Sequence, residues 1–393
     1  MSRSTADHPY HFKVIADRIK SCQFIIHLLP HTEERDHDMT EEITAMTWNT
    51  NGEGGIAETT SQAQIDFLND HHQDTDLFLL QAVDYEKQGE DNWDGHLGKL
   101  IQYFESSGYH CEHTADWDHQ FHNLDAQPYQ SINSPFERCK LTASRWKVDR
   151  NPLDLTEMKR RNPEHLNYFY ANFPTSILVT DIHHPSHEIT DNEGLQVWNG
   201  SAIHGSGWKE EKINVLETIY SQIFLQNDQT EKMVVLGGDF NAPKKEIRKE
   251  TEHDVVGEIV PHNSGKLYYN KPFYGNPYRY RDGEGGTVKF PFKQRWGNAE
   301  SYVFDLEKSD WNMKDAYWHA DCSAKQSSPD DYTYDFHRDN VDNKRLDHLL
   351  ADNHFNITHC EIQNGINVEA NGSRNGSKPS DHAPVKATFE IKA

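Results

Sequence analysis

The stretch Met233-Val-Val-Leu-Gly-Gly-Asp-Phe-Asn241 is the most informative segment of this chain, because an apolar run stops there in polar groups. Residues 233–237 are apolar and rich in β-branched side chains, and they end in glycine, which predicts a buried strand. Asp239 and Asn241 follow at the strand's end, where residues two apart can face the same side. A carboxylate and an amide would then converge on one bound group. Taken alone, the same residues are also typical of an ordinary β-turn.

A second polar group lies near the C-terminus, in Ser380-Asp381-His382, just before the alternating segment 385–391. The alternation predicts a strand with one buried face. Asp381 beside His382 would orient or charge the imidazole, which a neutral histidine cannot achieve alone near pH 7. Taken alone, this histidine is also typical of a solvated loop.

Three further segments complete the pattern. Residues 45–48 form a short apolar run that ends in Asn49 and Asn51, and residues 77–83 read Leu-Phe-Leu-Leu-Gln-Ala-Val. The third segment, 345–350, reads Arg-Leu-Asp-His-Leu-Leu and contains Asp347. Each segment is unremarkable by itself, and the order in which they occur carries the information.

In that order, TWNTNG, LFLLQAV, GGDFNAP, KRLDHLL and PSDHAPV resemble the endonuclease/exonuclease/phosphatase superfamily, with its deoxyribonuclease-I-like fold, over residues 43–391. The resemblance implies a four-layer α/β sandwich: two packed, mostly antiparallel sheets flanked by helices, with the active site at one edge. It also implies a divalent cation, Mg²⁺ or Mn²⁺, and hydrolysis of phosphodiester bonds by an activated water.

The resemblance also implies roles for single residues. Asp239 resembles the residue that orients or deprotonates the attacking water, and Asn241 resembles the group that polarises the phosphate. His382 is similar to the imidazole that contacts the phosphate, and Asp347 to the acid that pairs with it. The metal-site positions fall on Asn49, Asn51 and Asp381. In-line attack needs a base, a cation and donors for developing charge, so these roles are chemically consistent.

The main departure from the family pattern is Gln81-Ala82, where relatives normally have Gln-Glu and the glutamate is the main metal ligand. A methyl group cannot bind magnesium, which requires hard oxygen ligands. Three explanations stay open: a substitution introduced to silence the enzyme, a naturally impaired site, or replacement of the ligand by Asp84 or Glu86. Asp84 would share the side of Ala82 if the strand continues.

A second departure lies in residues 197–208, where relatives carry a histidine or tyrosine just after the strand. By spacing, Ser201 takes that position, and His204 follows later between residues that include glycine, which permits close backbone approach. We expect His204 to contact phosphate, with a purely structural role as the alternative. Residues 208–224 then have the apolar stripe of an amphipathic helix.

The net charge of −24 argues against broad affinity for a polyanion, because phosphate binding draws on lysine and arginine. The aromatic and basic segment 266–281 is the strongest candidate for a local exception. Rings interleaved with cations suit the unpaired bases of single-stranded or flexible nucleic acid; the residues are Tyr268, Tyr274, Arg279 and Tyr280. The alternative for this segment is a loop that folds onto its own surface. The alternatives for the function of the protein are a phosphatase for small or lipid phosphoesters and a non-catalytic binding module.

The domain organisation expected from these patterns is an N-terminal helical extension and linker, 1–42, followed by the catalytic domain, 43–393. Five cysteines without a C-x-x-C pair favour a reducing compartment. No apolar run reaches the eighteen or so residues that a membrane-spanning helix needs. We therefore expect a cytoplasmic protein that acts on nucleic acid.

Overall fold

The computed structural model of the chain describes residues 42–51, 58–87, 93–115, 138–151, 176–185, 194–202, 209–227, 232–241, 279–281, 287–289, 299, 303–304, 311–320, 333–334, 345–363 and 379–392. The expected N-terminal extension therefore lies outside the described residues, apart from its last residue, Glu42, at which the first strand begins.

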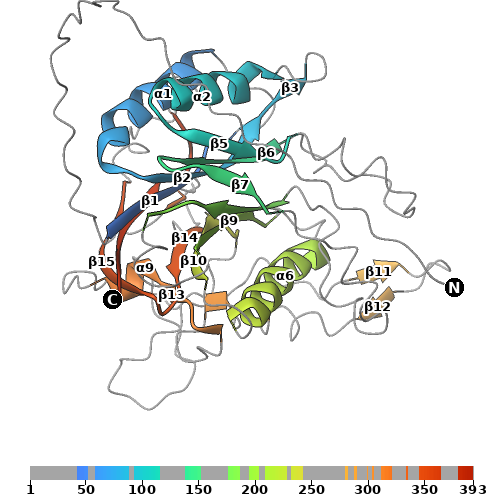
Figure 1. The fold of residues 1–393 in the computed structure, drawn as a ribbon. Coiled ribbons are helices and arrows are strands. Elements are labelled where there is room, and N and C mark those ends of the chain that lie inside the picture. Colours follow the sequence, from blue (N-terminus) through green and yellow to red (C-terminus); the bar gives the residue numbers. More distant parts are fainter. Residues whose placement is uncertain are drawn as a thin grey trace, which may run out of the picture. The chain divides into compact units, whose positions relative to one another are not determined.

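Two six-stranded sheets form the framework (Figure 1). In spatial order, the first contains β15 (Phe355–Ile362), β16 (Val385–Ile391), β1 (Glu42–Asn49), β2 (Leu77–Asp84), β6 (Arg138–Ser144) and β5 (His110–His113). The second contains β13 (Lys314–Asp315), β14 (Asp347–Ala351), β10 (Met233–Asp239), β9 (Leu195–Ser201), β8 (Ile177–Ile182) and β7 (Val148–Arg150). Only β1 with β2 and β10 with β9 run parallel within these sheets; the other neighbours are antiparallel.

Helices cover the outer faces of both sheets (Figure 1). On the first sheet, α1 (Glu58–His71) and α2 (Gly95–Ser106) bury Leu68 and Phe104 in a cluster with side chains of β1, β2 and β6. On the second sheet, α6 (Lys209–Asn227) buries Ile213 and Leu216 against β9 and β10. A third cluster fills the space between the sheets. The predicted four-layer α/β sandwich of two packed, mostly antiparallel sheets is therefore confirmed.

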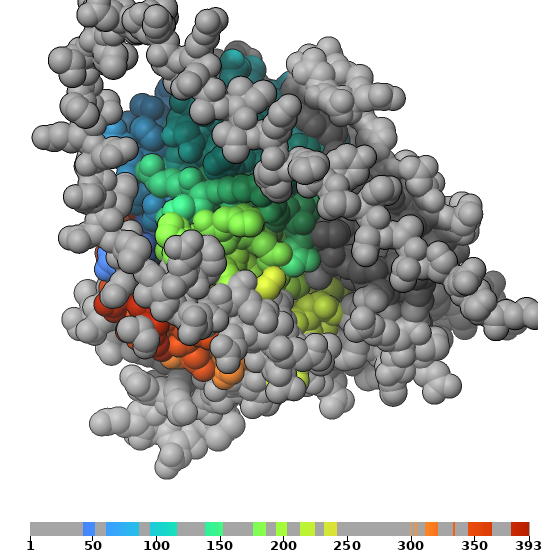
Figure 2. Space-filling model, viewed as in Figure 1, coloured from blue at the N-terminus to red at the C-terminus, as the bar shows by residue number. Residues whose placement is uncertain are grey.

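The remaining described elements are short. They are η1 (His72–Asp74), α9 (Ala316–His319) and the two-stranded pairs β3 (Glu86–Lys87) with β4 (Trp93–Asp94), and β11 (Arg279–Arg281) with β12 (Thr287–Lys289). The predicted helix within 208–224 corresponds to α6. The first and last strands of the main fold pair with each other, and the space-filling view shows β1, in dark blue, next to the red C-terminal strands (Figure 2).

Two glycines allow the strands to approach closely beside the end of β10. A Cβ atom on Gly238 would lie 1.8 Å from the carbonyl oxygen of Gly200 on β9. A Cβ atom on Gly237 would meet Leu79 and Thr47 of the opposite sheet at 3.1 and 3.2 Å. Only glycine fits at position 238, because the clash there is with backbone, whereas a side chain at position 237 would require neighbouring side chains to shift. Asp239 lies two residues after Gly237 and therefore faces the same side, toward the first sheet.

A buried pair of amides joins the two sheets near the same edge. Gln81 of β2 donates from Nε2 to Oδ1 of Asn199 on β9 at 2.9 Å. Asn199 in turn donates to the backbone carbonyls of Leu80 and Leu141 at 3.2 and 3.0 Å. Because unpaired amides in a core are costly, this arrangement fixes how the sheets face each other.

The described cysteines Cys111, Cys139 and Cys360 form no disulfide with one another. Among the helices that the structure describes, none combines the length and the apolar character needed to cross a bilayer.

Candidate active site

Polar side chains from both sheets meet at one edge of the sandwich. Asn49 is the last residue of β1, and Asp239 is the last residue of β10. Asp347 opens β14 directly opposite Asp239 in the antiparallel register. His382 lies just before β16, which pairs with β1. Residues that lie far apart in sequence are thus brought together because strand ends meet at a common edge.

Asp239 is the most heavily coordinated carboxylate of this group, and it is 1% exposed. Its Oδ2 accepts hydrogen bonds from the side-chain amides of Asn49 at 2.8 Å and Asn241 at 2.9 Å. Its Oδ1 accepts one from the backbone N–H of Asn241 at 2.9 Å. Asn241 has a φ of 48°, a left-handed conformation that asparagine tolerates better than most residues. The turn after β10 therefore holds the Asp239 carboxylate in place.

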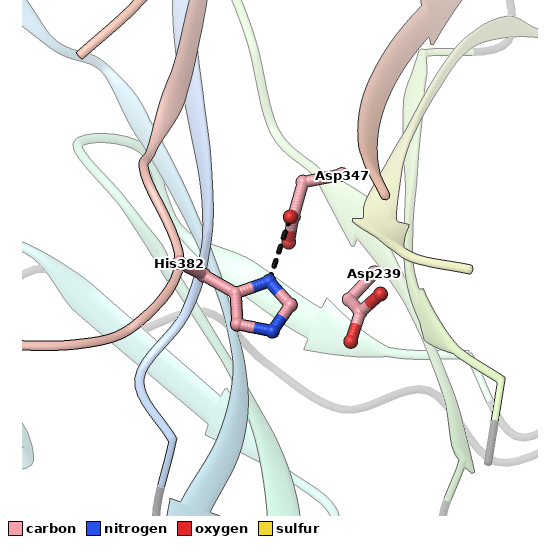
Figure 3. A group of neighbouring side chains, drawn as sticks. All are labelled: Asp239, Asp347 and His382. Atoms are coloured by element: carbon pink, nitrogen blue, oxygen red, sulfur yellow. Dashed lines mark hydrogen bonds and ion pairs between the residues drawn. The ribbon is translucent and has the colours of Figure 1, made fainter. Parts of the chain in front are cut away.

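Asp347 and His382 form a buried pair, shown in Figure 3 with Asp239 facing the imidazole ring. His382 Nδ1 lies 2.8 Å from Asp347 Oδ2. The His382 ring packs against Tyr334 with centroids 4.7 Å apart, and the backbone N–H of His382 donates to Ser380 Oγ at 3.0 Å. The ring is therefore oriented by Asp347. Asp381, considered for that role from its position beside His382, acts on the ring only through its charge.

The electrostatic environment of this group suits Asp239 to act as a base and His382 to act as an acid. Burial and the neighbouring Asp347 carboxylate raise the pKa of Asp239. Burial alone would lower the pKa of His382, but the carboxylates of Asp347 and Asp239 outweigh it and raise that pKa to about 10. At neutral pH the histidine is consequently an imidazolium, and the proton affinity of Asp239 is enhanced. Neighbouring groups whose environments assign them opposite roles are characteristic of acid–base sites.

Possible ligand atoms of Asp239, Asp347 and His382, one from each, also lie within 4.8 Å of one another. With His382 protonated, the oxygens of the two carboxylates are the ligands that this group offers to a metal ion. Oδ1 of Asp347 and Oδ1 of Asp381 are buried, and they have no hydrogen-bond partner within the described residues. Buried carboxylate oxygens normally have partners, so these two atoms have capacity for a cation. Asn49 instead turns its NH₂ group toward Asp239. It thereby supports the carboxylate, and its Oδ1 accepts the backbone N–H of Asn51.

Ala82 lies in a β-bulge near the end of β2, and its φ is 51°. Leu80 and Val83 both face the helix-side cluster although they are three residues apart. The bulge therefore puts Gln81 and Ala82 together on the side that faces the other sheet. Asp84 returns to that side, as expected for a strand that continues, and stands opposite Arg138 of β6.

Two positively charged residues of β6 near the site are not identified by the sequence analysis. Arg138 and Lys140 alternate with the apolar Cys139 and Leu141, a pattern that could have indicated a strand with one charged face. Asp381 and Asp239 both act electrostatically on Arg138, and Asp239 acts on Lys140. Lys140 is 3% exposed, and burial lowers its pKa to about 8. The acidic edge is thus faced by buried positive charge.

The other predicted site residues are distributed as follows. Ser201 ends β9 opposite Asp239 in the parallel register, and Asn51 has a left-handed φ of 51°. His204, Tyr268 and Tyr274 lie outside the described residues. Arg279 and Tyr280 are part of β11, which pairs with β12 in a separate two-stranded sheet, and only their backbone is described. The group that the structure brings together consists of Asn49, Asp239, Asn241, Asp347 and His382.

Comparisons with known proteins give matches at the level of structure only. No family model matches the sequence, and no curated protein matches it. Among solved structures, truncated TDP2 from Caenorhabditis elegans shares 13% identity at a TM-score of 0.47, covering 90% of this chain and 100% of its own. An endonuclease/exonuclease/phosphatase from Bacteroides vulgatus shares 15% at 0.48, covering 89% and 99%. An AP endonuclease from Archaeoglobus fulgidus shares 16% at 0.47, covering 89% and 100%. At identities of 13–16%, the likeness concerns the fold alone.

Proposed function

We propose that this protein is a phosphoesterase that hydrolyses phosphodiester bonds, most directly a nuclease acting on DNA or RNA. The observation that carries the proposal is the buried group of Asp239, Asp347 and His382. Hydrolysis of a phosphodiester needs a base for water and a donor to the phosphate oxygens. This group supplies one of each at the same edge of the sandwich.

In the proposed mechanism, Asp239 accepts a proton from the attacking water. Its raised pKa brings it nearer to the operating pH, which favours general-base catalysis. The amides of Asn49 and Asn241 fix its orientation through hydrogen bonds of 2.8 and 2.9 Å. The base is therefore already positioned before substrate binds, which reduces the cost of organising it during the reaction.

His382 is proposed to bind a non-bridging phosphate oxygen as an imidazolium. Its Nδ1–H is engaged by Asp347, so the donor proposed for the substrate is Nε2–H, whose nitrogen lies 3.5 Å from Asn49 Nδ2. The neighbouring carboxylates keep the ring protonated, with a pKa of about 10. Asp347 thus acts through the histidine, by fixing its orientation and its charge.

A divalent cation, Mg²⁺ or Mn²⁺, belongs to this proposal. The unpartnered Oδ1 of Asp347, which belongs to the group with Asp239 and His382, fits such an ion, since magnesium is often bound by one or two carboxylates together with water and substrate phosphate. When bound, the ion would polarise the phosphate and stabilise developing negative charge. Ala82 supplies no oxygen, so we expect weak metal affinity and low activity, as a substitution introduced to silence the enzyme would produce.

The test is hydrolysis of single-stranded DNA, RNA and bis(p-nitrophenyl) phosphate with Mg²⁺ or Mn²⁺, comparing the chain with Ala82→Glu and with the isosteric control Ala82→Gln. The expected result is metal-dependent cleavage that increases strongly with Glu and not with Gln, because only Glu adds an anionic metal ligand. Cleavage of none of the three substrates by any of these proteins would contradict the proposal.

Two alternative functions have specific support. The net charge of −24 favours a phosphatase for small or lipid phosphoesters over an enzyme for long nucleic acid. Cleavage of bis(p-nitrophenyl) phosphate without cleavage of DNA or RNA would favour this alternative. Ala82 itself favours a non-catalytic binding module, which predicts that restoring glutamate produces no activity.

A further inference from the structure

Lys140 stands directly across from the bulge that contains Ala82. In the antiparallel pairing of β2 with β6, Leu80 is opposite Leu141 and Val83 is opposite Cys139. Lys140 therefore faces the two-residue bulge formed by Gln81 and Ala82. This places a lysine next to the position at which the family resemblance leads one to expect a glutamate.

The side chain of Lys140 is on the inner side of its sheet. Its neighbours Cys139 and Leu141 both contribute to the cluster under the helices, on the outer face. Alternation in a strand then directs Lys140 toward the opposite sheet. Thr142, two residues along, follows the same rule, because its Oγ1 accepts a hydrogen bond from Asn199 of the second sheet at 3.4 Å.

The ammonium group of Lys140 has no direct partner within the described residues, although the residue as a whole is buried. The residue is 3% exposed, and its side chain makes no hydrogen bond or ion pair that involves the described part of the chain. Its backbone groups are occupied, since Lys140 N–H donates to Thr114 Oγ1 and Lys140 C=O accepts from the Thr114 N–H. A buried lysine without a partner is unfavourable for stability, so the binding of an anion beside it would be favoured.

A buried lysine elsewhere in the same sheet shows the compensated arrangement. Lys386 of β16 is 7% exposed, and its Nζ lies 2.7 Å from Asp74 Oδ2. The two lysines thus have similar burial in one sheet, but only Lys386 has a carboxylate partner. The missing partner of Lys140 is located at the candidate active site, where Asp239 acts on it electrostatically from the opposite sheet.

We propose that Lys140 is a phosphate-binding residue, and that its ammonium group, facing Ala82, lets this site bind a phosphate group without a divalent cation. The proposal rests on the proposed function and specifies how substrate is bound. The Ala82 side chain offers no carboxylate to the lysine, whereas a glutamate at position 82 would form an ion pair with it.

The experiment measures binding of inorganic phosphate by isothermal titration calorimetry in buffer with excess EDTA. We expect the unmodified chain to bind phosphate and Lys140→Met to bind it about tenfold or more weakly, since a hydrogen bond to a charged group contributes roughly that factor or more. Lys386→Met is the matched control, because it removes a lysine of similar burial from the same sheet. It should leave phosphate affinity unchanged. Thermal unfolding of each variant shows whether it is folded.

A second pair of variants tests the same point without removing Lys140. Ala82→Glu places a carboxylate across from Lys140 and should weaken metal-free phosphate binding, whereas Ala82→Gln has the same length without charge and should weaken it less. Equal affinity of Lys140→Met and the unmodified chain would overturn the proposal. Binding of phosphate by the unmodified chain only after Mg²⁺ is added would overturn it as well.

These outcomes are separate from those of the hydrolysis test. Phosphate binding that depends on Lys140 in a protein that cleaves no phosphodiester would support the present inference and contradict the proposed activity. Cleavage with Mg²⁺ by a protein whose phosphate binding is indifferent to Lys140→Met would do the reverse.

Discussion

Two buried aspartate–histidine pairs share strand β14, which contributes one residue to each. Asp347 pairs with His382 at the sheet edge, whereas His348, the next residue, pairs with Asp315 of β13 at 2.9 Å. Consecutive residues of a strand face opposite sides, so the two pairs lie on opposite faces of one sheet. Their surroundings differ in charge, because the guanidinium of Arg345 lies beside Asp315, whereas the carboxylate of Asp239 lies beside Asp347 and His382.

The pair with the guanidinium is fully compensated. Both oxygens of Asp315 accept hydrogen bonds from Arg345, at 3.2 and 2.9 Å, and Oδ1 also caps α9 through the N–H of Tyr317. Although burial opposes ionisation, Arg345 and His348 hold the pKa of Asp315 well below its usual range. At the other pair, Asp347 faces Asp239, and the pKa of Asp239 is raised. Two equally buried aspartates thus have opposite shifts, and the comparison distinguishes a structural network from a reactive one.

The largest expected effect concerns Asp239. In an Ala82→Glu background, Asp239→Asn should lower the rate of phosphodiester hydrolysis by roughly 10²–10⁴-fold, the usual contribution of a general base. The free energy of unfolding should change little or increase, because the substitution removes a carboxylate that burial and Asp347 disfavour. Hydrolysis rates and urea unfolding of the same two proteins measure both quantities. A large loss of stability with an unchanged rate would reverse the assignment of the two regions.

Asp315→Asn should show the opposite behaviour. The substitution leaves Arg345, which is 1% exposed, without its anionic partner. Breaking a buried ion pair from one side costs about 3–5 kcal/mol of unfolding free energy. Urea unfolding would detect this change, while hydrolysis measured well below the unfolding transition should be retained. A stability equal to that of the parent would contradict a structural role for Asp315.

Asp347→Asn should lower the pKa of His382. The carboxylate contributes both a hydrogen bond of 2.8 Å and a charge that favour the imidazolium. Removing an opposite charge at such a distance typically shifts a pKa by about 1–3 units. An NMR titration of the His382 ring in both proteins would measure the change. An unaltered titration would mean that Asp347 does not set the charge of the histidine.

The smallest expected effect is the pH dependence that Asp315 contributes to stability. Its folded-state pKa is depressed, so its contribution is present above its unfolded-state pKa of about 3.9 and is lost as the pH falls below that value. The difference in unfolding free energy between the parent and Asp315→Asn should therefore shrink from pH 5 toward lower pH, in the range where the parent still folds. A difference that is constant with pH would contradict the assigned pKa direction.

Much of the framework could be predicted from sequence because each strand near the site carries a local signal. The apolar run of β10 stops at Gly237-Gly238-Asp239, and the run of β1 stops at Asn49. Polar residues directly after buried strands report where the strands end, and strand ends share an edge. The sequence therefore predicts that the side chains of Asn49, Asp239 and His382 belong to the site.

The parts that escaped prediction depend on contacts between distant residues. Asp315 and Arg345 are 30 positions apart, and neither carries a local sign of its partner. The bulge at Ala82 changes the face of the sheet on which the side chains after it lie, and no turn residue in the sequence indicates the bulge. Lys140 is charged, and sequence patterns assign charged residues to solvated surface. Its burial follows only from the pairing of β6 with β2.

The most direct test of the account compares His382→Gln with His348→Gln, in an Ala82→Glu background, by the rate of bis(p-nitrophenyl) phosphate hydrolysis at a temperature at which both variants are folded. The two histidines are equally embedded in aspartate pairs, so general loss of packing affects both. We expect His382→Gln to lose roughly 10²–10⁴-fold in rate, and His348→Gln to keep the parent rate with reduced stability. Equal rates in the two variants would contradict the assignment of the Asp347–His382 pair to the chemistry.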